Sequence, residues 1–172
     1  MVTLESEFLK FSMEKLEQLA GRIEICVGKL TPEQVWQRGS EQENAVGNLL
    51  LHLNGNVRQW ILSGIGGAPD VRVRDREFAA REGAPPAELV ARMRSTVTEA
   101  VAVIGGLTAE QLLERTTVQG YEGSKLAGIY HVVEHFAGHA FQIILLTKLF
   151  TGADLGFYAH LAGRASSSGS PP

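Results

Sequence analysis

An eleven-residue segment that begins with a histidine occurs twice in this chain, and it restricts the possible folds more than any other feature. Residues 52–62 read HLNGNVRQWIL, and residues 135–145 read HFAGHAFQIIL. Five of the eleven positions are identical, the first histidine among them. Two copies of one helix can meet across a pseudo-twofold axis, which would place His52 and His135 face to face. The second copy adds His139, so we expect three histidines near one point.

Apolar residues recur at three- and four-residue steps in four long segments, which is the pattern of amphipathic helices. We expect helices over residues 4–30, 40–62, 85–104 and 124–150. No segment alternates between apolar and polar residues with period two, so strands are not expected. Four long helices joined mostly by short connections predict an all-α fold, a four-helix bundle.

A second, shorter repeat supports a duplication. Residues 30–34 read LTPEQ and residues 107–111 read LTAEQ. Each has threonine at the N-cap position and glutamine three residues later, which is a capping box that starts a short turn of helix. The motif follows the first and the third predicted helix. The chain is therefore interpreted as a duplicated helix-turn-helix unit.

The remaining segments define the domain and its connections. At 172 residues the chain is long enough for one domain with its own core, which we place at residues 1–162. Residues 163–172 contain four serines and two prolines, so they are expected to form a disordered tail. Residues 63–83 form the only long irregular connection, and a connection of this length is often functional.

Charge and cysteine content exclude several classes of function. The formal net charge of −3 gives no electrostatic reason to expect nucleic acid or an anionic membrane as a partner. Cys26 is the single cysteine, so an intrachain disulfide is impossible and a reducing compartment is the simpler assumption. Glu5 and Glu7 lie where a signal peptide would be basic. We expect a cytoplasmic protein.

The histidines of the last predicted helix suggest a metal site. His135 and His139 are four residues apart, so they can bind one ion from the same face, and His52 can complete a tripod. Three imidazole nitrogens suit zinc, nickel or iron and leave positions open for water or substrate. His131 forms an equally good pair with His135, so spacing alone leaves the ligand set open. His160 lies beyond the helix and is interpreted as a surface residue.

Two common metal motifs do not fit the sequence. A zincin helix requires glutamate directly after its first histidine, but Phe136 follows His135. A di-iron carboxylate bundle requires glutamate three residues before a histidine, where this chain has Leu49, Gly128, Val132 and Phe136.

The chain closely resembles the DinB/YfiT-like family of metal-dependent bundle proteins. The resemblance rests on residues 48–56, which read NLLLHLNGN, and on the pattern of His135, His139, Gln142 and Ile143. It also includes Trp36 and the DREF sequence of residues 75–78, and it spans nearly the whole chain. It implies a four-helix bundle in which the metal is held by His52, His135 and His139. The usual family ending is His-Arg-Gly-Gln-Ile, whereas this chain has HAFQI, which alters the pocket near the metal.

The resemblance also implies a class of reaction. It predicts a metal-dependent enzyme acting on a small molecule, by thiol S-transfer with a low-molecular-weight thiol or by hydrolysis. The expected cofactor is a divalent ion, zinc or nickel first and iron or manganese as alternatives. Asn56, Arg58 and the loop at residues 72–76 are candidates for binding an anionic thiol.

A second function from a different class stays open. The chain could be a non-catalytic bundle, a dimeric scaffold or a small-molecule binder, whose histidines are hydrogen-bonded core residues. A homodimer is expected under both hypotheses, because the helix over residues 124–150 is apolar on more than one face.

Overall fold

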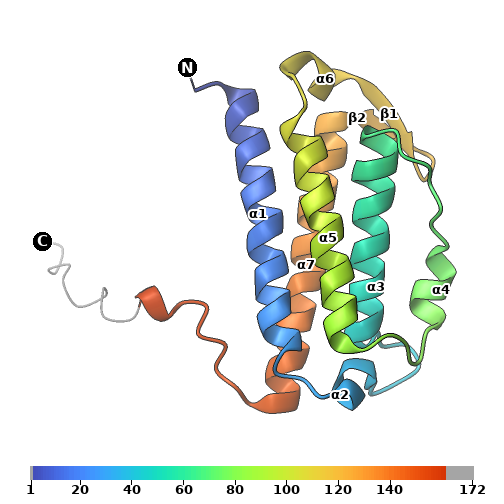
Figure 1. Ribbon diagram of the computed structural model, residues 1–172, viewed down its shortest axis with the longest axis vertical. Coiled ribbons are helices and arrows are strands. Elements are labelled where there is room, and N and C mark those ends of the chain that lie inside the picture. The colour runs from blue at the N-terminus through green and yellow to red at the C-terminus, as the bar shows by residue number, and fades with distance from the viewer. Residues whose placement is uncertain (1, 162–172) are drawn as a thin grey trace, which may run out of the picture.

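Four amphipathic helices bury their apolar faces against one another in the computed structural model, which describes residues 2–161 (Figure 1). The all-α bundle expected from the periodicity of the sequence is confirmed. The long helices are α1 (Leu4–Val27), α3 (Val46–Val57), α5 (Pro86–Gly105) and α7 (Lys125–Thr151), and α3 continues into a π-helical segment, η1 (Arg58–Ile65). The shorter elements are α2 (Pro32–Trp36), α4 (Arg74–Ala79), α6 (Ala109–Leu113), β1 (Arg115–Val118), β2 (Tyr121–Ser124) and η2 (Ala159–Leu161).

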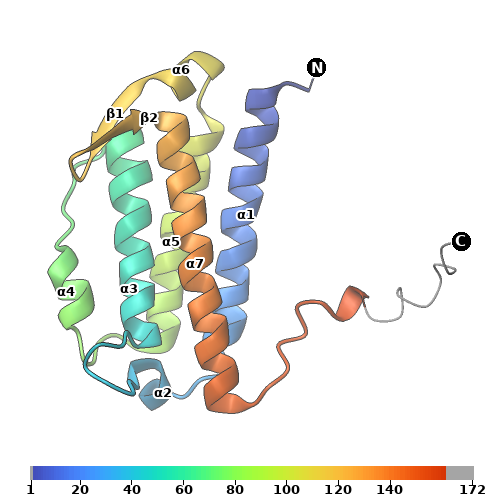
Figure 2. The ribbon, with the colours of Figure 1, turned by 180° about the vertical axis from the view of Figure 1, so that it is seen from behind.

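The order of the helices around the bundle explains the long central connection. Both α1 and α3 pack against α5 and α7, so α1 and α3 occupy opposite corners (Figures 1 and 2). The chain runs one way in α1 and α7 and the other way in α3 and α5. Because α3 and α5 are parallel, the chain must return along the bundle between them. It does so outside α3, and this crossover carries α4.

Both predicted capping boxes are present. The Thr31 backbone N–H donates to Gln34 Oε1 at 2.9 Å, and the Gln34 N–H donates to Thr31 Oγ1 at 3.2 Å. The Thr108 and Gln111 pair repeats this arrangement at 2.9 and 3.3 Å. These reciprocal bonds satisfy N–H groups that the first turn of a helix otherwise leaves unpaired. They start α2 and α6 at equivalent places in the two halves of the chain.

The second long helix begins later than predicted. A start at Ser40 is wrong, because the Glu43 carboxylate accepts from the Gly39 N–H at 2.9 Å and closes a turn that does not continue as helix. The helix α3 begins at Val46, where the Asn48 side-chain oxygen accepts the Ala45 N–H at 3.1 Å. Asn48 also donates to the carbonyl oxygens of Glu77 and Ala80 at 2.8 and 2.9 Å. The start of α3 is thus tied to the crossover.

The expectation that the chain has no strands is wrong. Strands β1 and β2 form an antiparallel hairpin whose turn residues, Gln119 and Gly120, both have positive φ, 55° and 79°. Two such residues match the right-handed twist of a hairpin. Each strand has four residues, too few to show an alternating pattern. Val118 packs against η1 at Gly64, where an added Cβ would lie 2.3 Å from its Cγ2.

The surface of α7 is partly apolar. Its exposed apolar side chains are Tyr130, Phe141, Leu145 and Leu149. Within residues 2–161, no helix is at once long and apolar enough to span a bilayer. The homodimer stays a prediction, and the tail predicted at residues 163–172 lies outside the described residues.

We predict that Asn48→Ala lowers the free energy of unfolding by about 2–3 kcal/mol, because it removes an amide that makes four hydrogen bonds in a fully buried position. Urea denaturation followed by circular dichroism measures the change. The matched control is Asn44→Ala at an exposed position, which should stay within about 0.5 kcal/mol of the unchanged protein. Equal effects of the two substitutions would contradict this role of Asn48.

Candidate metal centre

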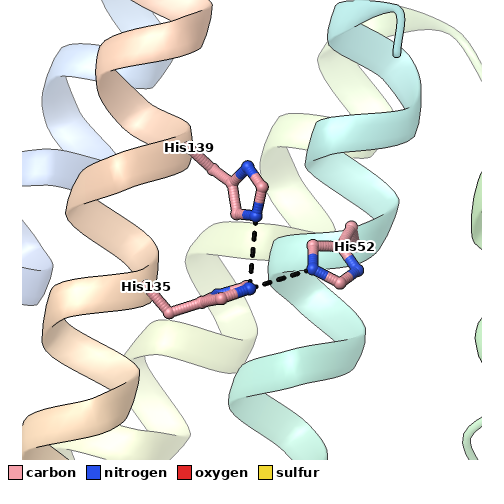
Figure 3. A group of neighbouring side chains, drawn as sticks. All are labelled: His52, His135 and His139. Atoms are coloured by element: carbon pink, nitrogen blue, oxygen red, sulfur yellow. Dashed lines mark hydrogen bonds between the residues drawn. The ribbon is translucent and has the colours of Figure 1, made fainter. Parts of the chain in front are cut away.

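Three histidines from two antiparallel helices converge at the centre of the bundle (Figure 3). His52 comes from α3, and His135 and His139 come from successive turns of α7. One ligand nitrogen from each ring can be chosen so that all three atoms lie within 4.8 Å of one another. The structure therefore brings together the three histidines that the sequence singled out, and their nitrogens could hold a metal ion.

The distances suit a small ion. His135 Nε2 lies 3.0 Å from His52 Nε2 and 3.2 Å from His139 Nε2. Nitrogens bound to one tetrahedral zinc ion at ~2.0–2.1 Å would be about 3.3 Å apart. These two contacts, dashed in Figure 3, are hydrogen bonds when His135 carries its proton on Nε2. When all three rings carry their protons on Nδ1, the three lone pairs repel one another, and a cation between them removes the repulsion. The donor set therefore fits a divalent ion.

Glu77 and Arg72 fix the orientation of His52. His52 Nδ1 lies 3.0 Å from Glu77 Oε2, and both side chains are buried. Arg72 donates to both carboxylate oxygens of Glu77, at 2.7 and 2.8 Å. Arg72 Nη2 also lies 3.1 Å from His52 Nδ1, but it already donates to Glu77 Oε2 at 2.8 Å. An ionised carboxylate only accepts hydrogen bonds, so the contact with Glu77 favours the tautomer with a proton on Nδ1, which leaves Nε2 free to bind. Carboxylate support of this kind is usual behind metal-ligating histidines.

The charge of Glu77 is maintained despite its burial. Burial by itself raises the pKa of Glu77, but hydrogen bonds from Arg72 and His52 outweigh this effect and lower the pKa below its ordinary value. The carboxylate is therefore ionised at neutral pH and can accept the His52 proton.

The two histidines of α7 are in the neutral form that metals bind. Burial, together with the charges of the neighbouring His139 and His52, lowers the pKa of His135 to about 3. Burial also lowers the pKa of His139, although a hydrogen bond between its Nδ1 and Gln142 Oε1 at 2.7 Å opposes the shift. This bond places the His139 proton on Nδ1 and leaves Nε2 free. Both rings are therefore ready to ligate at neutral pH.

Gly55 allows the crossover to approach the back of His52. A Cβ added at Gly55 would lie 2.1 Å from Glu77 Oε1 and 2.8 Å from Arg72 Nε. The equivalent glycine of the second repeat, Gly138, has no atom within 4 Å of such a Cβ. The shared glycine thus has a steric role in the first copy only.

A cavity of about 540 Å³ opens beside the histidines. His52 and His135 form part of its wall, and the tip of the hairpin contributes Gln119, Tyr121 and Glu122. Trp60, from η1, faces α7, where its ring lies 4.3 Å from the ring of His131, centroid to centroid. π-helical turns often occur at functional sites.

Four buried side-chain polar atoms lack a hydrogen-bond partner within residues 2–161. Three of them belong to residues that line this cavity, namely Asn56 Oδ1, Trp60 Nε1 and His135 Nδ1. A buried polar atom left unpaired costs about 1–3 kcal/mol, and native structures contain few of them. These three atoms are themselves buried, so the packing around the cavity leaves them unsatisfied.

The other residues proposed from the sequence fall in different places. Asn56 lines the cavity, but Arg58 lies elsewhere and faces Glu99 at 3.7 Å. His131 packs against Trp60, with the two rings tilted by 43°, and does not join the three ligand nitrogens. His160 is exposed.

Sequence reasoning missed Glu77 and the specific position of Arg72. Both lie in the predicted loop, so helical periodicity could not place them beside His52. The one sequence feature that included Glu77 was the DREF sequence of residues 75–78, and it indicates no contact with His52 by itself. The hairpin residues at the mouth of the cavity gave no signal, because they belong to strands that were not expected.

The comparisons with known proteins establish the family and the fold. The model of a family described as "Protein of unknown function (DUF1572)" matches residues 3–160. A solved structure described as "Crystal structure of the conserved protein of locus from Enterococcus faecalis" is similar with a TM-score of 0.69 and 14% sequence identity, over 84% of this chain and 97% of that chain. At this identity the likeness shows the fold alone. No curated protein matches the chain.

We predict that Gly55→Ala weakens zinc affinity by about 10–100-fold, the usual effect of losing the carboxylate support behind a ligating histidine, because the new methyl group displaces Glu77. The matched control is Gly138→Ala, which adds the same methyl group to an open position on α7. Chelator competition measures both affinities. A Gly55→Ala variant that binds zinc as tightly as the control would contradict the role of Glu77.

Proposed function

The chain belongs to the DUF1572 family, whose model covers residues 3–160, and we propose from the geometry of its histidines that it is a metal-dependent enzyme acting on a small molecule. The observation that supports the proposal most directly is the convergence of three histidine nitrogens beside a cavity large enough for a substrate. Metal-binding groups at a cavity wall are typical of catalytic sites rather than of closed structural ones.

His52, His135 and His139 would hold the ion, and zinc or nickel suits three imidazole ligands best. A divalent ion supplies one kind of chemistry here, since it lowers the pKa of a bound water or thiol and so gives a nucleophile at neutral pH. Three protein ligands leave further positions for that nucleophile and for substrate. Two of the three, His52 and His135, line the cavity, so a molecule in the cavity would lie beside the ligand group.

Residues around the ligands orient the site. Arg72 and Glu77 hold His52 in one tautomer, and Gln142 does the same for His139. Gln59 links this group to the mouth of the cavity, because its side-chain oxygen accepts hydrogen bonds from Arg72 and from Gln119 of the hairpin. The hairpin thereby forms one side of the cavity.

Two reaction classes remain as proposals, thiol S-transfer and hydrolysis. The resemblance to DinB/YfiT-like proteins supports the first, with a low-molecular-weight thiol as co-substrate. Both classes need the same ion and the same three ligands, so metal binding is the first property to test.

We predict that untagged protein contains or takes up about one equivalent of zinc or nickel. His52→Ala and His139→Ala should each reduce the metal content to near zero, because two remaining imidazoles bind weakly. His131→Ala is the matched control and should retain the metal, since its ring packs on Trp60 outside the ligand group. Inductively coupled plasma mass spectrometry measures the content.

A chain that takes up neither metal at micromolar concentration would overturn the proposal. If the metal binds as expected, the loaded protein is then assayed for thiol transfer and for hydrolysis, with His139→Ala as the inactive reference.

A further inference from the structure

A second cavity, of about 400 Å³, lies between α1, α7 and the segment that follows α7. This segment lies on the α1 side of the bundle (Figures 1 and 2), and we call the space the C-terminal cavity. Its lining consists of Arg22, Phe141, Ile144, Lys148 and residues 154–159. Around α7, Phe141 and Lys148 are about half a turn away from His135 and His139, because each residue turns the helix by about 100°. The C-terminal cavity is therefore separate from the metal centre.

Two glycines direct the chain into the wall of this cavity. Gly152 ends α7 with a φ of 63°, and Gly156 has a φ of 65°. Residues with a Cβ rarely adopt such values, so glycine is favoured at both positions. Between and after them, Leu155 is buried and Phe157 is partly buried, and both pack with the hydrophobic core. This packing holds the wall against the bundle.

The two cations of the C-terminal cavity have no acidic partner. Arg22 and Lys148 form no ion pair within residues 2–161, and neither has an acidic residue three or four positions away on its own helix. The guanidinium group of Arg22 instead lies over the rings of Phe157 and Tyr158, 5.2 and 5.3 Å from their centroids. Its nitrogens are not among the buried unpaired atoms, so solvent can reach them. They can therefore donate to a bound molecule.

The charges of the lining favour a ligand with a single negative charge. Asp154 is the one acidic residue that lines the C-terminal cavity, and its Oδ1 accepts the Gly156 N–H at 2.9 Å. With Arg22 and Lys148, the lining has two positive groups and one negative group. An organic monoanion would balance this charge, whereas a phosphate monoester would bring nearly two negative charges at neutral pH.

The other side chains of the lining favour an apolar body on the ligand. Phe141 and Ile144 of α7 form one side, and Leu155 and Phe157 belong to the opposite segment. Phe141 is 53% exposed, so an apolar group in the cavity would remove part of its ring from water. Apolar walls with a few charged groups are typical of small-molecule sites.

We propose that the C-terminal cavity binds a small organic monoanion with an apolar body, of which a monocarboxylate is the simplest. Arg22 and Lys148 bind the carboxylate, and Phe141 and Phe157 contact the body. A guanidinium group suits this role because it can donate two parallel hydrogen bonds to one carboxylate. None of the lining residues belongs to the metal centre, so the site does not depend on the proposed function.

The test is a titration of the full chain with 4-phenylbutyrate, followed by ¹H–¹⁵N NMR. The backbone signals of Gly156 and Phe157 should shift and saturate, while the signal of Gly128 reports any separate binding beside the metal centre. Two comparison compounds each lack one feature, since 4-phenylbutyramide has no charge and acetate has no apolar body. Each should bind at least about tenfold more weakly than 4-phenylbutyrate.

Two variants test the cations. Arg22→Gln and Lys148→Gln each remove one positive charge, and each should weaken the binding of 4-phenylbutyrate by about tenfold. The matched control is Lys15→Gln on α1, because the Lys15 ammonium group also lies over an aromatic ring, that of Phe11 at 5.2 Å, but does not line the cavity. The control should keep its affinity within about twofold, since a distant exposed charge is screened.

The inference is overturned if the signals of Gly156 and Phe157 do not saturate with 4-phenylbutyrate. This includes binding that shifts Gly128 alone, and a cavity that a second copy of the chain already covers. Equal binding of either comparison compound, or unchanged binding in either glutamine variant, would also overturn it. Zinc content is measured separately, so the metal-dependent function and the monoanion site can fail independently.

Discussion

The buried carboxylate of Glu77 is the group on which the site depends. Moving an ionised carboxylate out of water is costly unless it is paired and hydrogen-bonded. Arg72 and His52 supply these partners, and Gly55 leaves the space in which the three side chains meet. Asn48 anchors the backbone carbonyl of Glu77 itself. Loss of either partner would leave a buried charge unpaired. Arg72 and Glu77 therefore hold the ring of His52 in one orientation.

The irregular elements of the fold shape the cavity, while the regular ones position the ligands. The π-helical turn of η1 places Trp60 against α7, and the hairpin packs on the same segment at Gly64. Gln59 joins the two, since it accepts a hydrogen bond from Gln119 and another from Arg72. A molecule that enters the cavity therefore contacts elements that are linked by hydrogen bonds to the support of His52.

The sequence predicted the features that depend on local periodicity and failed for those that depend on tertiary contacts. Helical spacing located the long helices and paired His135 with His139, because side chains four residues apart share a face, and the internal repeat placed His52 opposite His135. The start of α3 at Val46 depends on contacts of Asn48 with the distant crossover, which no local signal encodes. Of the arginines proposed from the sequence, Arg58 faces Glu99 and Arg72 pairs with Glu77 behind His52, because the path of a loop is set by what it packs against. The hairpin escaped detection because four-residue strands carry too little pattern.

The packing of the helices also bears on how such a chain could have arisen. The two halves of the repeat contain α1 with α3 and α5 with α7, and the contacts described above join helices of different halves. A single half would expose the apolar faces of both its helices and could bury them only against a second copy. The bundle therefore has the form of a dimer of two similar helix pairs that the crossover joins into one chain. After such a fusion each half could diverge. The two equivalent glycines show this divergence, because Gly55 is packed against Glu77 and Arg72 whereas Gly138 faces open space.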